Sequence, residues 1–94
     1  MQLEKHQFIK IVEEITLGFE KPEFQAELKA AKEAGDIQKL ISLPMQLQTG
    51  IFATHGLDPV GGMALFKEAG KRFALEPEAA PYMERMKKAL AVLT

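Results

Sequence analysis

The sequence predicts an all-α fold, a single-domain bundle of five or six short helices. Apolar residues recur at spacings of three and four, the period of a helix with one buried face. No stretch alternates between apolar and polar residues for long enough to predict a strand. Proline, glycine and aspartate divide the chain at short intervals. Because 94 residues suffice for one modest core, we expect residues 1–94 to form a single helical domain.

The first two helices are predicted from an apolar stripe and from helix-boundary residues. Pro22 suits the first turn of a second helix, since its missing N–H would be unpaired there in any case. Gly35 is expected to end that helix, and Asp36 to cap the next one. The stripe of the first helix consists of Phe8, Ile11, Val12, Ile15 and Phe19.

The middle of the chain is expected to hold two helices separated by a proline. A short third helix should close near Leu43, because the residue before Pro44 avoids helical dihedral angles. A fourth helix is predicted from Met45 to His55, and we expect it to lie near the middle of the bundle.

The carboxy-terminal part is expected to supply the last two helices. Asp58 and Pro59 are a typical N-cap and first-turn pair, so a fifth helix should run from Pro59 to about Phe73. An anion site at this helix start is disfavoured, because no strand precedes it and no nucleotide-binding glycine pattern follows. The inward face of the last helix is predicted to consist of Ala79, Tyr82, Met83, Met86, Ala89, Leu90 and Leu93.

Composition disfavours several classes of function. The 12 Lys and Arg against 13 Asp and Glu give a net charge of −1, which argues against binding nucleic acid through bulk attraction to phosphate. Cysteine is absent, so disulfides, thiolate catalysis and sulfur-ligated metals are excluded. His6 and His55 are far apart and lack zinc-site spacing. We therefore predict no metal and no cofactor.

Catalysis and membrane insertion are also disfavoured. Ser42 is the single serine and lacks the context of a nucleophile, so we expect no catalytic residue and no enzyme activity. The first residues carry charges of both signs, and no apolar run is long enough for a signal peptide or a membrane span. A cytoplasmic location is the resulting expectation.

One stretch of the sequence departs from the even spread of charge. From Leu40 to Phe66 the only charged side chain is Asp58, although 27% of the whole chain is charged. A helix exposed to water would normally carry more charge than this. We therefore expect that water does not freely reach the stretch, either because it is core or because it faces a partner or ligand.

The same stretch supplies the candidate binding site. Helical spacing puts part of it on one face, and the glycine-rich start of the next helix should lie alongside. The predicted groove is lined by Gln48, Phe52, His55, Met63 and Phe66. We expect a non-catalytic protein–protein interaction module whose neutral groove takes an apolar or amphipathic segment.

Three other interpretations stay open at the level of sequence. The protein could carry a small apolar ligand in a pocket between the fourth, fifth and sixth predicted helices. It could associate with itself through the same neutral face. The fourth helix could also be a purely structural element whose polar side chains bond to the backbone or to water.

Overall fold

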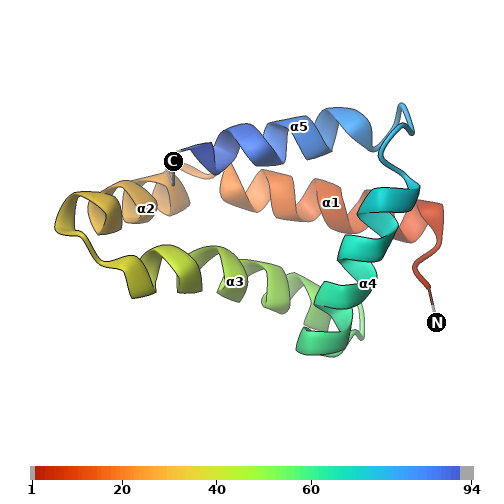
Figure 1. Cartoon of the computed structure of the whole chain (residues 1–94), viewed down its shortest axis with the longest axis horizontal. Coiled ribbons are helices and arrows are strands. Elements are labelled where there is room, and N and C mark those ends of the chain that lie inside the picture. Colours follow the sequence, from red (N-terminus) through yellow and green to blue (C-terminus); the bar gives the residue numbers. More distant parts are fainter. Residues whose placement is uncertain (1, 92–94) are drawn as a thin grey trace.

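The structure is a computed structural model that describes residues 2–91 of the chain (Figure 1). This part of the chain contains five helices joined by short connections. The predicted all-α fold is confirmed, with the lower of the two expected helix numbers. The predicted inward position of Leu93 lies outside the described residues. In chain order the helices are α1 (Lys5–Phe19), α2 (Pro22–Ala34), α3 (Ile37–Thr54), α4 (Pro59–Arg72) and α5 (Ala80–Ala89).

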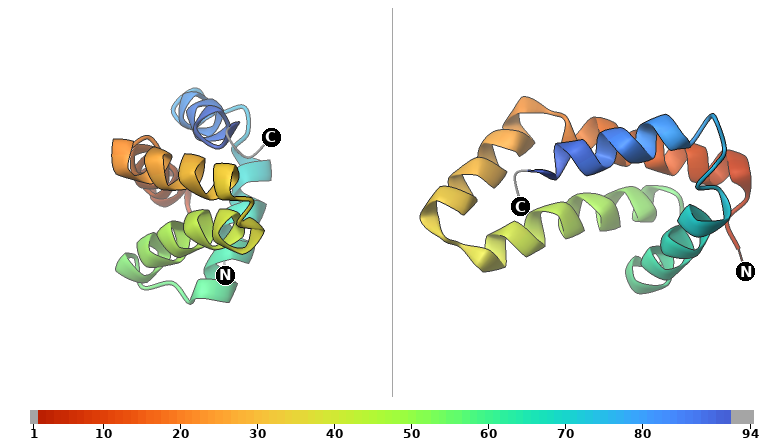
Figure 2. Two further views of the ribbon diagram at one scale, coloured as in Figure 1. Left: turned by 90° about the vertical axis from the view of Figure 1, so that its left-hand side faces the viewer. Right: turned by 45° about the horizontal axis from the view of Figure 1, so that its top comes forward.

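The central helix is α1. It packs against all four other helices, and in Figure 2 it lies between α5 and α3. The prediction of a central fourth helix is therefore wrong, because α3 contributes only Phe52 as a fully buried side chain. The predicted stripe of α1 is confirmed as the middle of the core, with no exposure at Phe8, Ile11, Val12, Ile15 or Phe19.

α3 runs without interruption through Pro44, so the predicted break near Leu43 is wrong. A proline inside a helix costs about 3 kcal/mol because it removes one backbone hydrogen bond and crowds the preceding turn. This cost is offset by packing, since α3 packs against α1, α2 and α4. Asp36 also caps the helix by accepting a hydrogen bond from the Lys39 amide at 3.1 Å.

The predicted boundaries of α2 and α4 are confirmed. Gly35 ends α2 in the left-handed region, with φ 70°, where glycine carries no steric penalty. Asp58 caps α4 by accepting a hydrogen bond from the Gly61 amide at 2.8 Å. The carboxylate therefore occupies the helix start at which an anion would otherwise bind.

α5 is attached to α1 by apolar packing, and to α1 and the first turn of α2 by polar links. The buried Thr16 hydroxyl donates to the Tyr82 carbonyl at 3.1 Å. The Gln25 amide donates to the Ala89 carbonyl at 2.9 Å. Arg85 donates from its Nε to Glu20 at 3.0 Å. The partly buried side chains of α5 that pack on the core are the predicted ones, Tyr82, Met83, Met86 and Ala89, followed by Leu90 at the helix end.

The ion pair between Glu20 and Arg85 makes the attachment of α5 sensitive to acid. The hydrogen bond from Arg85 lowers the pKa of the Glu20 carboxyl below its ordinary value of 4.5. A carboxyl with a lowered folded-state pKa stabilises the protein above its unfolded pKa and loses that effect as the pH falls through the folded value. We therefore expect Glu20→Gln to have a lower Tm than wild type at pH 7, and the difference to shrink as the pH falls and the Glu20 carboxyl takes up its proton.

Thermal melts followed by circular dichroism between pH 7 and pH 3 measure this difference. The effect should be small, because both side chains are partly exposed to water. A Tm difference that is the same at pH 3 as at pH 7 would contradict the assignment to the ion pair.

Candidate functional site

The stretch with few charges lies along α3 and the first half of α4, and much of it is exposed. Ile37, Ile41 and Met45 are 70%, 60% and 50% exposed, and their four-residue spacing aligns them along one face of α3. The expectation that water does not freely reach the stretch from Leu40 to Phe66 is therefore wrong for Ile41 and Met45, whereas Ile37 lies just before that stretch. The physical reason is visible in Figure 1. There α4 crosses only the carboxy-terminal end of α3 and does not cover the amino-terminal end of α3.

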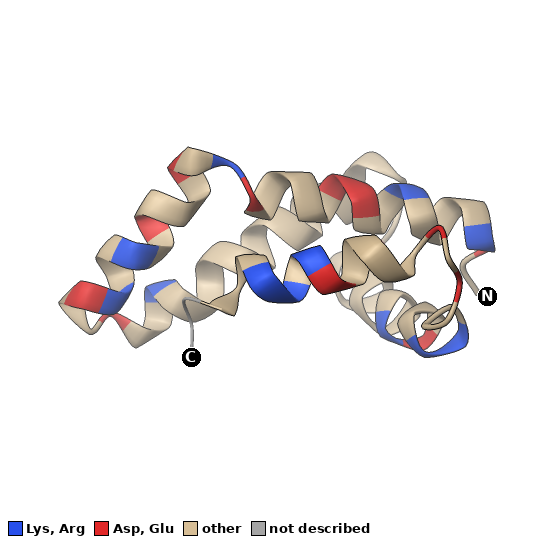
Figure 3. Cartoon of the chain, turned by 90° about the horizontal axis from the view of Figure 1, so that it is seen from above, with Lys and Arg blue, Asp and Glu red and all other residues tan. Residues whose placement is uncertain are grey.

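This uncharged surface differs from the rest of the molecule. Along α2, both Lys and Glu recur on the ribbon, as Figure 3 shows. Between Lys39 on α3 and Lys67 on α4, in contrast, Asp58 is the only charged side chain. We call the exposed apolar residues Ile37, Ile41 and Met45 the α3 stripe.

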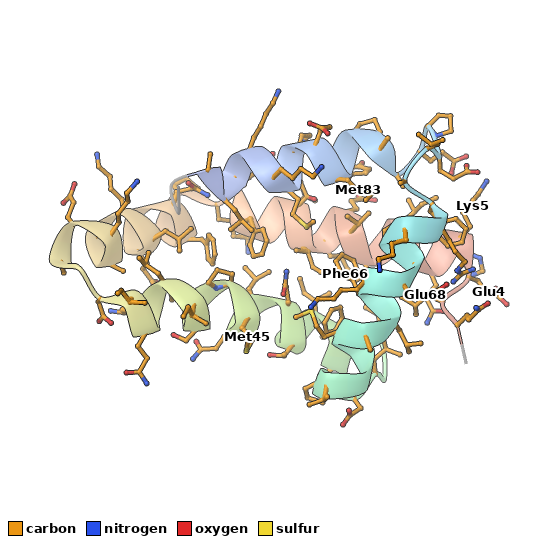
Figure 4. All side chains as sticks on the ribbon, viewed as in Figure 1. Glu4, Lys5, Met45, Phe66, Glu68 and Met83 are labelled. Atoms are coloured by element: carbon orange, nitrogen blue, oxygen red, sulfur yellow. The ribbon has the colours of Figure 1, made fainter. Side chains whose placement is uncertain are left out.

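The α3 stripe leads into an open groove between α3 and α4, with a volume of about 470 Å³. Met45, which belongs to both, is labelled in Figure 4. Most of the lining residues are exposed, so the hollow is a groove and not an enclosed cavity. The lining comes from α3 at Met45 and Thr49 and from α4 at Pro59, Val60, Met63, Ala64 and Lys67.

The walls of the groove are adjacent in the chain and are joined by a short, well-ordered turn. Gly56 adopts a left-handed conformation, with φ 73°. The Leu57 amide then donates to the Phe52 carbonyl at 2.9 Å, and the Leu57 side chain is buried. This pattern of a glycine followed by a buried apolar residue is a common helix ending. It sends the chain directly into the Asp58 cap of α4.

Of the predicted site residues, Met63 lines the groove, whereas the two aromatic residues belong to the core. Phe52 is fully buried and Phe66 is 8% exposed. Their ring centroids are 5.7 Å apart, and Phe66 also lies 5.4 Å from the ring of Phe8. The structure brings Phe52 and Phe66 together, but their role is to join α4 to α3 and α1.

Gln48 and His55 are not among the residues that line the groove. Gln48 is half-buried on α3. The Nε2 atom of His55 lies 2.6 Å from a carboxylate oxygen of Glu14, which ties the end of α3 to α1. His55 therefore forms a polar link between two helices.

The predicted site omitted six of the residues that line the groove, Met45, Thr49, Pro59, Val60, Ala64 and Lys67. The four-residue spacing from Met45 to Thr49 was a usable signal for the α3 wall. The turn signals at Gly56 and Asp58 were a signal for the other wall, since a short connection brings the first turns of α4 beside the end of α3.

A second hollow, of about 530 Å³, lies between α1 and α3. Its α3 residues Leu47 and Ile51 are about 200° around the helix from Met45 and Thr49, so the two hollows flank opposite sides of α3. The second hollow contains charges of both signs, Glu14 and Lys21, whereas the groove between α3 and α4 contains a single charge. The groove is therefore the more uniformly apolar of the two.

Within residues 2–91, no three His, Asp or Glu side chains come together as a metal site would require. No helix in the same range is both long and apolar enough to cross a bilayer. Comparison with family models, with curated proteins and with solved structures found no match for the chain.

Proposed function

We propose that this protein is a non-catalytic interaction module that holds an apolar or amphipathic segment of another protein in the groove between α3 and α4. The observation that carries the proposal is the continuity of exposed apolar side chains from the α3 stripe into the groove. Contiguous apolar patches of this kind are uncommon on monomeric proteins and mark contact surfaces.

The energetics favour covering this surface. Val60 is 81% exposed and Ile37 is 70% exposed, so both side chains keep most of their apolar area in water. Fully burying a valine or isoleucine side chain is worth about 1.5–3 kcal/mol relative to leaving it exposed. A segment lying on the α3 stripe and in the groove would recover part of that free energy. Met45 and Met63 supply flexible side chains that adapt to different apolar partners.

The shape of the groove favours a segment over a small molecule. Ligand pockets usually enclose most of their ligand, whereas a helix or extended segment binds in an open groove with one side still in water. The exposed α3 stripe continues the apolar surface beyond the groove, which a long segment can use and a small molecule cannot.

Placing a charge on the groove wall should weaken binding without unfolding the protein. We expect Val60→Asp to weaken binding of an amphipathic segment at least about tenfold, because the carboxylate would have to be desolvated against apolar side chains. The probe is a synthetic, fluorescein-labelled helical peptide of 15 residues with leucines at helical spacing. Fluorescence anisotropy gives its Kd for each variant.

Leu75→Asp is the matched control, because Leu75 is 95% exposed and lies in the connection between α4 and α5, outside the groove. It should bind the peptide like wild type. Circular dichroism and thermal melts should show both variants folded. Equal affinity in Val60→Asp and wild type, or no binding of the peptide to wild type, would contradict the proposal.

One observation favours a second candidate, a carrier of small apolar ligands. The groove volume of about 470 Å³ falls in the range of roughly 300–1,000 Å³ that is typical of ligand sites. The predicted pocket between three helices corresponds only in part, because the groove residues come from α3 and α4 without α5. Native mass spectrometry of the purified protein distinguishes the candidates, since a carrier should retain an extra mass that denaturation removes.

Self-association and location complete the proposal. We expect the protein alone to sediment as a monomer at several concentrations, because the groove is proposed to take a different chain.

A cytoplasmic location also remains part of the proposal, and fractionation of cells that express a tagged chain tests it.

A further inference from the structure

We propose that the segment held in the groove is an acidic amphipathic helix, with carboxylates beside its apolar face that pair with Lys67 and Lys71. This inference rests on the proposed function and specifies the chemistry of the partner. It follows from the charges at one end of the groove, the length of the α3 stripe, and the lack of charge complementarity between two copies of this surface.

The cations at the groove have no partner within the described part of the chain. Lys67 is the one charged residue of the groove lining, and Lys71 is exposed one turn further along the same side of α4. Neither lysine side chain forms an ion pair or hydrogen bond within residues 2–91. In contrast, Arg72, about 100° around α4 from Lys71, donates to Glu68 at 2.6 Å and to the Leu3 carbonyl at 2.6 Å.

The dimensions suit a helix. From Ile37 to Thr49 the apolar face of α3 spans twelve residue steps, which is about 18 Å or three helical turns. α4 crosses α3 at the end of this face (Figure 1). A partner helix lying along the α3 stripe therefore meets α4 at one of its ends. Lys67 and Lys71 are residues of α4. Carboxylates at this end of the incoming helix would neutralise the two ammonium groups.

A second copy of this chain would not supply those carboxylates. The carboxylate of the groove region is Asp58, and it already accepts the Gly61 amide at the start of α4. Asp36, which directly precedes the α3 stripe in the sequence, accepts the Lys39 amide at the start of α3. Two copies pressed together through the groove would bring Lys67 and Lys71 of each copy to a surface whose stretch from Leu40 to Phe66 holds one carboxylate per copy, so the lysines would outnumber the carboxylates. Unpaired charges of this kind disfavour an association.

The experiment uses two synthetic helical peptides that share one apolar face and differ in their flanking residues, glutamate in one and lysine in the other. Wild type should bind the glutamate peptide about tenfold more tightly than the lysine peptide at low salt, and the preference should shrink as salt is added. The double variant Lys67→Glu/Lys71→Glu should reverse the preference.

The matched control is Lys10→Glu/Lys29→Glu, which makes the same change in net charge on the exposed sides of α1 and α2. It should keep the preference of wild type. If the control also loses the preference, the effect comes from net charge and the inference is wrong. All variants are first checked for folding by circular dichroism.

The remaining outcomes separate this inference from the proposed function. Equal binding of both peptides to wild type, abolished by Val60→Asp, would overturn the acidic partner and leave the interaction module intact. Binding of neither peptide would count against both. A wild-type dimer in sedimentation that Val60→Asp dissociates would show a second copy in the groove and overturn the inference.

Discussion

Replacing Phe52 by alanine is expected to lower the free energy of unfolding by about 3–5 kcal/mol. Phe52 is fully buried, and its ring packs 5.7 Å from that of Phe66. Truncation removes most of the aromatic contact between α3 and α4 and leaves a cavity that the surrounding helices fill only in part. Small domains are stable by about 5–15 kcal/mol, so this single change should bring the protein close to unfolding at 25 °C.

Urea titration followed by circular dichroism measures this loss. Ile41→Ala is the control on the same helix, because Ile41 is 60% exposed and its truncation should cost much less. If Phe52→Ala and Ile41→Ala lower the free energy of unfolding by similar amounts, Phe52 is not a core residue. Its predicted place in the groove would then stand.

Replacing Gly62 by valine is expected to destabilise the protein by about 1–3 kcal/mol through overpacking. A Cβ atom at Gly62 would lie 3.1 Å from Cγ and 3.2 Å from Cβ of Phe52. The ring has little freedom to move away, since it is buried against Phe66. α4 would therefore have to shift outward from α3, which would also widen the groove.

Gly50→Val provides the matched control, because a Cβ at Gly50 in α3 has no atom within 4 Å. Its effect on the free energy of unfolding should stay within about 0.5 kcal/mol, since valine is a slightly better helix former than glycine. Comparison of the two urea midpoints isolates the contact at Gly62. If Gly50→Val destabilises the protein as much as Gly62→Val, the loss comes from replacing a helical glycine and not from the contact with Phe52.

Sequence patterns predicted much of the fold because they depend on interactions between residues a few positions apart in the chain. The spacing of Phe8, Ile11 and Ile15 identifies a buried face wherever the helix lies. The caps at Asp36 and Asp58 depend on hydrogen bonds within three residues. Pro44 shows the limit of such patterns, because its penalty is local whereas the packing that outweighs it comes from α1, α2 and α4.

The site was predictable only in part, for a related reason. Spacing indicates that Phe52 and Met45 lie on neighbouring parts of one face of α3, but not which end of that face another helix covers. The crossing of α4 decides this and makes Phe52 a core residue while Met45 stays 50% exposed. The scarcity of charge pointed to the part of the chain that supplies most of the groove lining. It did not reveal that this surface lies open to water.

The short turn between α3 and α4 has a consequence for how the protein folds. The two walls of the groove are separated by only a few residues, so little chain entropy is lost when they meet. Contacts between neighbours in sequence form faster than contacts between distant segments. The α3–α4 hairpin is therefore suited to assemble early, with α5 joining later through contacts about 65 residues apart, such as those of Gln25 and Arg85. Both walls of the groove are therefore brought together by the step that forms this one hairpin.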